Sequence, residues 1–254
     1  MDDEEPLQLS AHALAALQSF KQEEEARKKQ FEQLYQQVAQ ESENNSGISV
    51  DAEKSPTPAA SIDAFQEDWQ LSQFWYDDDT AATLARALLH GADEETVVCI
   101  ASAPSVFAAI GKLKPEEVPT KHIYLLEYDT RFSILAPGHF FAYDYSRPDD
   151  VPLLLRNKCH RLLIDPPFLE EQCQKKSAQA ARNLLVEDDG SVTASGDKRF
   201  KLISSTGERM REIIMESYPE TRETDFHPKH KNELGNEFRC YASFEWGGWR
   251  YVEA

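Results

Sequence analysis

The sequence predicts an α/β fold in which helices cover both faces of a mostly parallel sheet. Three observations support this prediction: apolar runs of strand length alternate with helical segments, acidic residues follow several of these runs, and one run ends at Asp165-Pro166-Pro167-Phe168. Strand–helix–strand units of this size are typical of parallel sheets, in which ligands bind at the carboxyl ends of the strands. We therefore expect the functional site at those ends.

The apolar run Arg161–Ile164, which precedes Asp165, is expected to be a buried strand. The strand must end at Asp165 because proline donates no hydrogen bond to a ladder and Pro167 favours an extended conformation at Pro166. A carboxylate, two rigid prolines and the Phe168 ring at a strand end make a candidate site. Asp-Pro-Pro is also ordinary turn chemistry, so the tetrapeptide alone leaves a functional and a purely structural interpretation open.

The remaining elements follow from the same patterns of apolar residues. Parallel strands are expected at Thr96–Ala101, Lys121–Leu126, Phe140–Tyr143 and Phe200–Ser205, and one or two antiparallel strands at Asn236–Phe244. Helices are expected at Ala81–His90, Val106–Leu113, Leu169–Leu185 and Glu208–Tyr218. Residues 186–199 are rich in Asp, Gly and Ser and are expected to form a surface-loop insertion.

Upstream of this alternation, the chain changes character twice. Residues 1–40 contain strong helix formers and a charged, glutamine-rich stretch, which predicts a helical extension. Residues 41–61 contain Asn-Asn-Ser-Gly and Ser-Pro-Thr-Pro with little to bury, which predicts a disordered linker. The compact domain is therefore expected over residues 62–254.

Composition restricts the classes of partner. The 254 residues are 41% hydrophobic and carry a formal net charge of −18, which disfavours nucleic acid and anionic membranes and suits a basic partner. No apolar run is long enough to span a membrane, and the acidic start is unlike a signal peptide, so we expect a cytoplasmic protein. We also expect a monomer. Four scattered cysteines without a CxxC pair predict reduced thiols and no metal site.

The predicted strand ends carry groups suited to a nucleoside ligand. Glu127 and Asp129 follow the second strand, where nucleoside-binding folds place a carboxylate on the ribose hydroxyls, and Asp144 follows the third, where it can accept from an adenine amino group. Either Glu127 or Asp129 fits the ribose role. Acidic residues at three successive strand ends indicate a ligand site more strongly than any one of these residues alone.

Two further segments complete the predicted ligand site. The first strand ends in a loop of small residues that lets backbone amides approach a ligand: Ser102, Ala103, Pro104 and Ser105. This loop lacks the glycine-rich spacing that NAD requires for its pyrophosphate, whereas S-adenosyl-L-methionine has no phosphate. Phe74 and Trp75, from a dense aromatic stretch, are either a structural flap or a wall of the pocket.

Several of these motifs together carry a resemblance to a known family. They are Gln8–Leu17, Trp69–Tyr76, Ser102–Val106, Glu127–Asp129 with Arg131-Phe132, the Asp165–Phe168 tetrapeptide, and Asn236–Tyr241. The chain resembles the elongation factor 1-alpha lysine methyltransferases, a family with a [D/N]PP[Y/F] tetrapeptide that was formerly grouped with N6-adenine methyltransferases. The resemblance covers about Leu7 to Tyr241, apart from the linker and the 186–199 insertion.

The resemblance implies a Rossmann-like sheet of seven strands with the last antiparallel, S-adenosyl-L-methionine as cofactor, and methylation of a lysine of elongation factor 1-alpha. It also implies that Asp165, Pro166, Pro167 and Phe168 are catalytic, and that Ser102–Ser105, Asp144 and one of Glu127 and Asp129 bind the cofactor. The alternatives are methylation of adenine in DNA or RNA, which needs a cationic groove for the strand, and a non-catalytic binding module.

Overall fold

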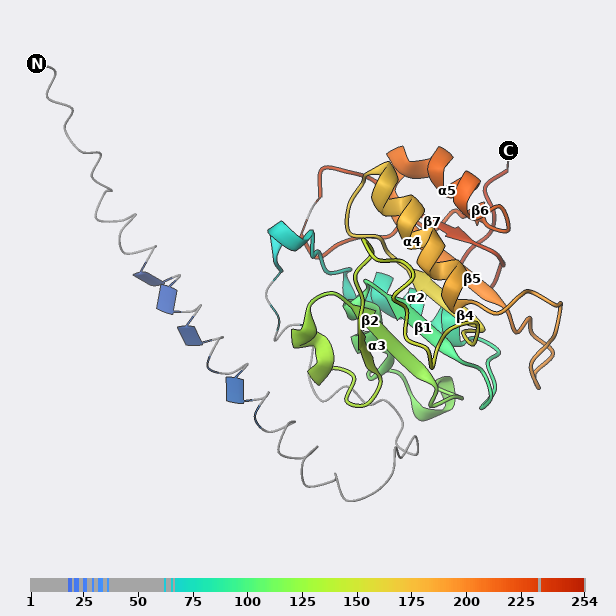
Figure 1. Cartoon of the computed structure of the whole chain (residues 1–254), viewed down its shortest axis with the longest axis horizontal. Coiled ribbons are helices and arrows are strands. Elements are labelled where there is room, and N and C mark those ends of the chain that lie inside the picture. The colour runs from blue at the N-terminus through green and yellow to red at the C-terminus, as the bar shows by residue number, and fades with distance from the viewer. Residues whose placement is uncertain are drawn as a thin grey trace, which may run out of the picture. The chain divides into compact units, whose positions relative to one another are not determined.

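The computed structural model contains a seven-stranded sheet with helices on both faces (Figure 1). It describes residues 67–232 and 234–253, together with Ile62, Phe65 and scattered helical positions between 18 and 36. The linker expected over residues 41–61 and most of the N-terminal extension, including Gln8–Leu17, lie outside the described residues. The strands are β1 (Val98–Ala101), β2 (Ile123–Glu127), β3 (Phe140–Ala142), β4 (Arg161–Ile164), β5 (Lys201–Gly207), β6 (Arg222–Glu223) and β7 (Phe238–Ala242).

The order of the strands is β3-β2-β1-β4-β5-β7-β6. Strands β1 to β5 run parallel to one another, and β7 pairs antiparallel with both β5 and β6. The predicted mixed sheet is therefore confirmed, including its antiparallel last strand. The chain reverses direction across the sheet between β1 and β4, so the carboxyl ends of β1, β2 and β4 surround the point where such folds bind ligands.

Among the described residues, four α-helices cover the sheet: α2 (Asp78–Leu89), α3 (Pro104–Ile110), α4 (Glu171–Leu184) and α5 (Arg211–Ser217). Short 3-10 helices occur at η2 (Trp69–Leu71), η3 (Pro115–Glu117), η4 (Thr130–Ile134) and η5 (Glu208–Met210). Helix α2 begins earlier than expected because the Asp77 side chain caps it by accepting from the Thr80 amide at 2.7 Å. Helices α2 and α3 lie together on one side of the sheet, and α4 and α5 on the other (Figure 1).

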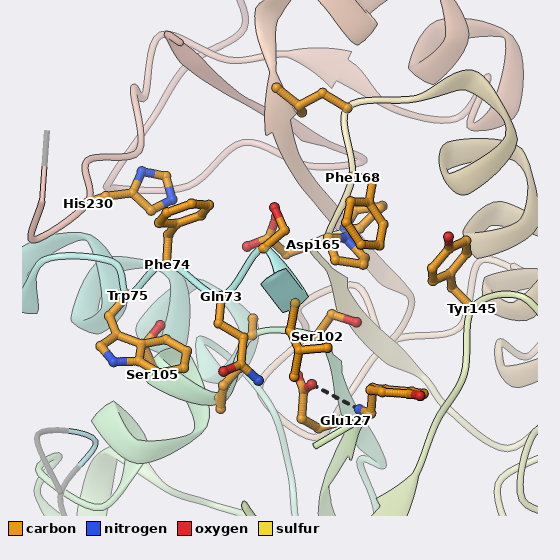
Figure 2. A pocket seen from close by; sticks show the side chains of 18 of the residues that line it. Gln73, Phe74, Trp75, Ser102, Ser105, Glu127, Tyr145, Asp165, Phe168 and His230 are labelled. Carbon is orange, nitrogen blue, oxygen red and sulfur yellow. Dashed lines mark hydrogen bonds between the residues drawn. The ribbon is translucent and has the colours of Figure 1, made fainter. Parts of the chain in front are cut away.

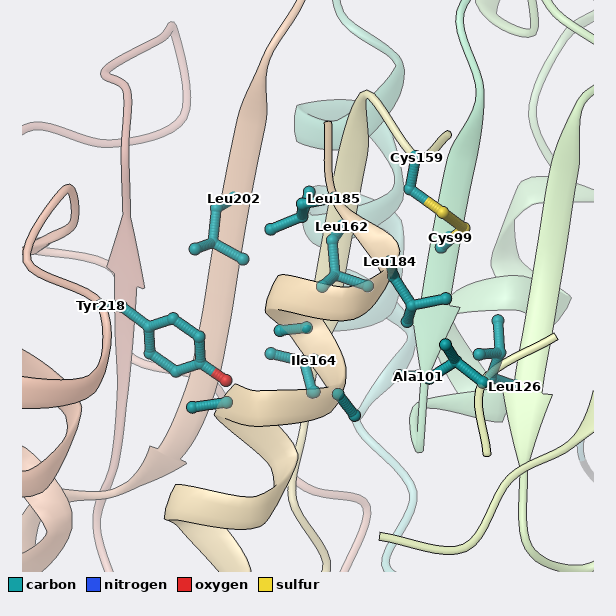
Figure 3. Close-up of a cluster of buried hydrophobic side chains, with 14 of the residues drawn as sticks. Cys99, Ala101, Leu126, Cys159, Leu162, Ile164, Leu184, Leu185, Leu202 and Tyr218 are labelled. Carbon is teal, nitrogen blue, oxygen red and sulfur yellow. A yellow bond between two sulfur atoms is a disulfide. The ribbon is translucent and has the colours of Figure 1, made fainter. Parts of the chain in front are cut away.

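Alternation of side chains along the strands separates two cores. On β1 and β4, Cys99, Ala101, Leu162 and Ile164 join one buried cluster, which also contains Leu184 of α4 (Figure 3). Since successive side chains on a strand point to opposite faces, Ile100 and Leu163 belong to the other layer. The fully buried residues of β1 and β4 thus pack against both helical layers, which holds these two strands in the centre of the sheet.

A disulfide joins Cys99 of β1 to Cys159, just before β4, with their Cα atoms 6.2 Å apart (Figure 3). The expectation of four reduced thiols is therefore wrong for this pair, because the fold brings together two buried side chains that lie 60 positions apart in sequence. Cys173 and Cys240 are free thiols, as expected, and both are buried.

Residues 186–199 return to the amino ends of the strands, away from the predicted site. Thr193 Oγ1 donates to the Gly91 carbonyl at 2.6 Å, and Arg199 pairs with Asp93 at 2.9 Å. Gly91 adopts a φ of +67°, and a Cβ there would collide with Asp197, so only glycine fits this contact. The insertion is largely exposed but anchored to the turn that follows α2.

Candidate active site

A cavity of about 450 Å³ opens at the carboxyl ends of β1, β2 and β4 (Figure 2). Of the residues predicted from the sequence, those that line it are Phe74, Trp75, Ser102, Ala103, Pro104, Ser105, Glu127, Asp144, Asp165, Pro166, Pro167 and Phe168. Cavities of this size are typical of small-molecule sites. The fold therefore brings together strand ends that are far apart in the sequence.

The loop after β1 turns sharply from the sheet into α3. Ser102 adopts a φ of 59°, a left-handed conformation that is uncommon for serine, and its amide donates to the Leu126 carbonyl at 2.9 Å. Pro104 then occupies the first turn of α3, where its missing amide hydrogen costs nothing. Strain of this kind at a cavity wall is typical of functional sites.

Glu127 and Asp129, the two candidates at the end of β2, have different environments. Glu127 lines the cavity, and its Oε1 accepts from the Tyr128 amide at 2.9 Å. Asp129 lies behind the lining, where it accepts from Gln73 Nε2 at 3.1 Å and from Arg131 Nε at 2.9 Å. The carboxylate of Asp129 is thus already hydrogen-bonded to Gln73 and Arg131, whereas the carboxylate of Glu127 faces the cavity and can contact a ligand.

The pKa values of these two carboxyls move in opposite directions. Burial raises the pKa of Glu127 to about 7, although the amides of Asp129 and Tyr128 oppose the shift. Desolvation alone would raise the pKa of Asp129, but the hydrogen bonds from Arg131 and Gln73 outweigh it and hold the pKa below its usual value. Asp129 is therefore a fixed anion, whereas Glu127 is a buried carboxyl whose charge changes near neutral pH.

Asp144 lines the cavity from the segment after β3. Its Oδ1 accepts from the Ser146 amide at 2.8 Å, and its Oδ2 lies 3.4 Å from Arg147 Nε. Desolvation pushes the pKa of Asp144 upward, yet the hydrogen bonds from Ser146 and the nearby Arg147 leave it lowered. Asp144 is therefore an ionised acceptor beside the cavity.

The Asp165–Phe168 loop projects from the end of β4 between two aromatic walls (Figure 2). The Asp165 amide donates to the Ala101 carbonyl at 3.1 Å, and the Phe168 carbonyl accepts from Gln174 Nε2 at 3.0 Å. Both ends of the loop are thus tied to the scaffold. The rings of Phe168 and Tyr145 lie edge to face, with their centroids 5.8 Å apart.

Asp165 lines the cavity but lies deep enough that desolvation raises its pKa to about 7. The nearby Glu127 charge raises the pKa further, and a hydrogen bond from Tyr76 opposes the shift. Near neutral pH, the site therefore contains two buried carboxyls that change charge in the same range. Acids with such perturbed pKa values in a cavity are typical of active sites.

These raised pKa values predict how stability depends on pH. Because the folded protein binds these protons more tightly than the unfolded chain, the contribution of Asp165 is favourable at low pH and is lost as the pH rises through about 7. Asp165→Asn removes the cost of the buried charge, so we expect it to stabilise the fold by about 1–3 kcal/mol at pH 8 and by little at pH 4. Urea unfolding at both pH values measures this difference, and an equal effect at both would contradict the shift.

Sequence reasoning proposed Phe74 and Trp75 as a wall of the pocket but missed the segment around His230, which completes this wall opposite the Asp165 loop. The backbone at Asp77 donates to the Lys229 carbonyl at 2.9 Å, and that at Lys231 donates to the Trp75 carbonyl at 2.8 Å, so two distant segments form this wall together. Between them, the His230 ring packs against Tyr76 and Phe238 with centroid distances of 4.8 and 4.4 Å. Burial lowers the pKa of His230 to about 4, so the ring is neutral.

Gln73, which the sequence analysis did not select, gives the cavity a free hydrogen-bond acceptor. Because a carboxylate only accepts, the contact with Asp129 identifies the Gln73 nitrogen and leaves Oε1 pointing away from it. This oxygen is buried and has no partner among the described residues, and Gln73 lines the cavity. A buried acceptor without a partner is costly, so the site fits a ligand that carries hydrogen-bond donors.

The residues present therefore fit a nucleoside with a cationic, donor-rich tail. Buried carboxylates, the Gln73 acceptor and aromatic walls favour hydroxyl, amino and positively charged groups. In the described part of the chain, no group of three or more His, Cys, Asp or Glu side chains is placed to hold a metal ion. Within the same residues, no helix is both long and apolar enough to cross a membrane.

The strand order, the antiparallel β7 and the Asp-Pro-Pro-Phe loop at the end of β4 define an S-adenosyl-L-methionine-dependent methyltransferase of the Rossmann-like class. Residues 67–246 match a family described as probable N6-adenine methyltransferase. The chain is 50% identical to protein-lysine N-methyltransferase EFM5 of Saccharomyces cerevisiae, over 96% of this chain and 94% of that protein. It is 34% identical to EEF1A lysine methyltransferase 1 of Homo sapiens, over 97% and 96%.

The chain belongs to the elongation factor 1-alpha lysine methyltransferase family. It is therefore a methyltransferase, and its cofactor is S-adenosyl-L-methionine. Among solved structures, one described as a predicted O-methyltransferase from Agrobacterium tumefaciens shares 13% identity over 64% of this chain and 78% of that chain, with a TM-score of 0.41. That likeness is too distant to bear on the function.

Proposed function

We propose that this protein transfers the methyl group of S-adenosyl-L-methionine to a lysine side chain of elongation factor 1-alpha. The observation that carries the proposal is the buried Asp165 carboxyl in a rigid Asp-Pro-Pro-Phe loop at the mouth of a nucleoside-sized cavity. The names of the relatives from Saccharomyces cerevisiae and Homo sapiens support lysine as the acceptor. A net charge of −18 suits a basic protein substrate better than nucleic acid.

The cofactor residues are assigned by their donor and acceptor chemistry. S-adenosyl-L-methionine supplies a methyl group activated by a positively charged sulfur. Glu127, rather than Asp129, would accept from the ribose hydroxyls, since Asp129 already holds Gln73 and Arg131. Asp144 would accept from the adenine amino group, and Gln73 Oε1 from a donor on the amino-acid portion. The backbone at Ser102–Ser105, with Phe74 and Trp75, would form the remaining wall.

The chain's role toward the acceptor amine is to align its lone pair with the methyl group. A lysine amine has an ordinary pKa near 10.4, so it must first lose a proton, which leaves to water before the site closes on the amine. Its lone pair can then form the new N–C bond as the bond between the methyl group and the sulfur breaks. Desolvation between Phe74 and Phe168 favours the neutral amine, whereas the negative charge of Asp165 favours the ammonium. Asp165 and the Pro166 carbonyl would accept the remaining N–H bonds and orient the lone pair. The Phe168 face would contact the positive charge of the methylated product.

The test compares acceptors directly. Purified enzyme is incubated with radiolabelled S-adenosyl-L-methionine and, separately, with unmethylated elongation factor 1-alpha, duplex DNA, single-stranded DNA and RNA. The proposal expects label on the protein alone. Label on adenine alone would favour the alternative that the family description names, and would overturn the lysine assignment.

Two further properties belong to the proposal. Because elongation factor 1-alpha works in translation, the enzyme is placed in the cytoplasm, where its substrate is. We also expect the purified enzyme to be a monomer. Sedimentation of the purified protein measures the second property, and a dimer at enzyme-assay concentrations would contradict it.

A further inference from the structure

Tyr76 lies directly behind the Asp165 carboxylate, in a position that the proposed mechanism does not yet use. Its side chain is 1% exposed, and its hydroxyl lies 2.6 Å from Asp165 Oδ2 and 2.7 Å from Ser205 Oγ. Ser205, on β5, is itself fully buried. Asp165 lines the cavity and Tyr76 does not, so Tyr76 contacts the carboxylate from outside the cavity lining.

The direction of these two hydrogen bonds follows from counting protons. A tyrosine hydroxyl has one proton, and an ionised carboxylate can only accept. The Tyr76 proton therefore points to Asp165, and Ser205 must donate its own proton to the Tyr76 oxygen. This chain from Ser205 through Tyr76 to Asp165 pins Oδ2, and the other carboxylate oxygen is left for the cavity.

We propose that Tyr76 is a positioning residue for methyl transfer, which, with Ser205 behind it, fixes the Asp165 carboxylate so that its second oxygen meets the acceptor amine. This inference rests on the proposed function, because it assigns Asp165 to the amine. The anchoring itself is a property of the protein without ligands. Charge-assisted hydrogen bonds are short and strong, and the 2.6 Å contact is of that kind.

Most ionisable groups around this pair keep a constant charge near neutral pH. Burial raises the pKa of Tyr76 well above its usual value, so it remains a donor. His230, which packs on the Tyr76 ring, is neutral because burial lowers its pKa to about 4. Burial keeps two nearby thiols protonated by raising the pKa of Cys173 on α4 to about 11 and that of Cys240 on β7 to about 12.

Glu127, at the end of β2, is the group near Asp165 that titrates in the same range, with a pKa of about 7. A pH profile of activity alone would therefore report the titration of both carboxyls together and would not isolate the pKa of Asp165. Labelling the protein with ¹³C-aspartate makes Glu127 silent in the spectrum. Asp165→Asn then identifies the Asp165 carboxyl signal by its absence.

The experiment uses Tyr76→Phe, which removes the hydroxyl and keeps the ring that packs on His230. In the protein without ligands, we expect the Asp165 pKa measured by ¹³C NMR to rise by about one unit, because the carboxylate loses a donor. At pH 7, we expect kcat to fall about 10- to 100-fold through misplacement of the carboxylate, with little change in the KM for S-adenosyl-L-methionine. The deficit should narrow as the pH rises toward 9.

Two variants separate positioning from general damage. Tyr218→Phe removes another buried hydroxyl, one without a hydrogen-bond partner in the described part of the chain, and should leave kcat and the Asp165 titration unchanged. Ser205→Ala keeps Tyr76 and should shift both quantities in the same direction as Tyr76→Phe, but less.

An unchanged Asp165 titration in Tyr76→Phe would overturn the inference, and so would a loss of kcat that is the same at every pH. If the wild-type enzyme does not methylate elongation factor 1-alpha, the proposed function fails, yet the titration still reports whether Tyr76 anchors Asp165.

Discussion

Replacing Asp165 with alanine is expected to lower kcat for methyl transfer at least about 100-fold, because the amine loses the acceptor that aligns its lone pair. Affinity for S-adenosyl-L-methionine should change little, since Glu127, Asp144 and Gln73 remain in place. Single-turnover transfer of labelled methyl measures the first quantity, and calorimetric titration measures the second.

The matched control for this variant is Asp188→Ala, which removes an exposed carboxylate from the 186–199 insertion. We expect its kcat to equal that of the wild type, because the insertion lies at the amino ends of the strands. Near-normal turnover in Asp165→Ala would show that the tetrapeptide does not hold the amine. A matching loss of cofactor affinity would place Asp165 in cofactor binding instead.

The second large effect is expected at Glu127. Glu127→Ala removes a buried carboxylate from the cavity, and hydrogen bonds to a charged group are worth about 1.5–3 kcal/mol, so the Kd for S-adenosyl-L-methionine should rise about 10- to 100-fold. Asp129→Asn keeps the shape of the side chain that holds Gln73 and should have a smaller effect. Calorimetric titration of both variants with S-adenosyl-L-methionine shows which of the two acids binds the cofactor. A larger loss of affinity in Asp129→Asn than in Glu127→Ala would assign the ribose contact to Asp129 instead.

Much of the fold could be predicted because its central strands are short, fully buried apolar runs. The strand at Arg161–Ile164 matches its expected bounds, and β1 and β2 begin two residues later than expected. Strand β6 was missed because two residues carry no periodic signal, and it forms only by pairing with β7. The Cys99–Cys159 disulfide was missed because it depends on tertiary packing between distant positions.

For the candidate site, sequence reasoning located the groups at strand ends, because the topology of a parallel sheet brings those ends together. It could not rank Glu127 against Asp129, since the difference lies in which of them Gln73 and Arg131 engage. Tyr76 was noted only as an aromatic residue, and nothing local marks its hydroxyl as the partner of Asp165, 89 positions away. No pattern in the sequence indicated that His230 belongs to the site.

The central claim, that Asp165 serves a lysine amine, is tested most directly by locating the methyl group on the product. Elongation factor 1-alpha is methylated by the wild-type enzyme and by Asp165→Ala, digested, and sequenced by tandem mass spectrometry. The account predicts a methyl increment on a lysine Nζ that appears with the wild-type enzyme and is absent with the variant. Methylation on a different kind of residue, or on the same lysine in equal yield with Asp165→Ala, would contradict it.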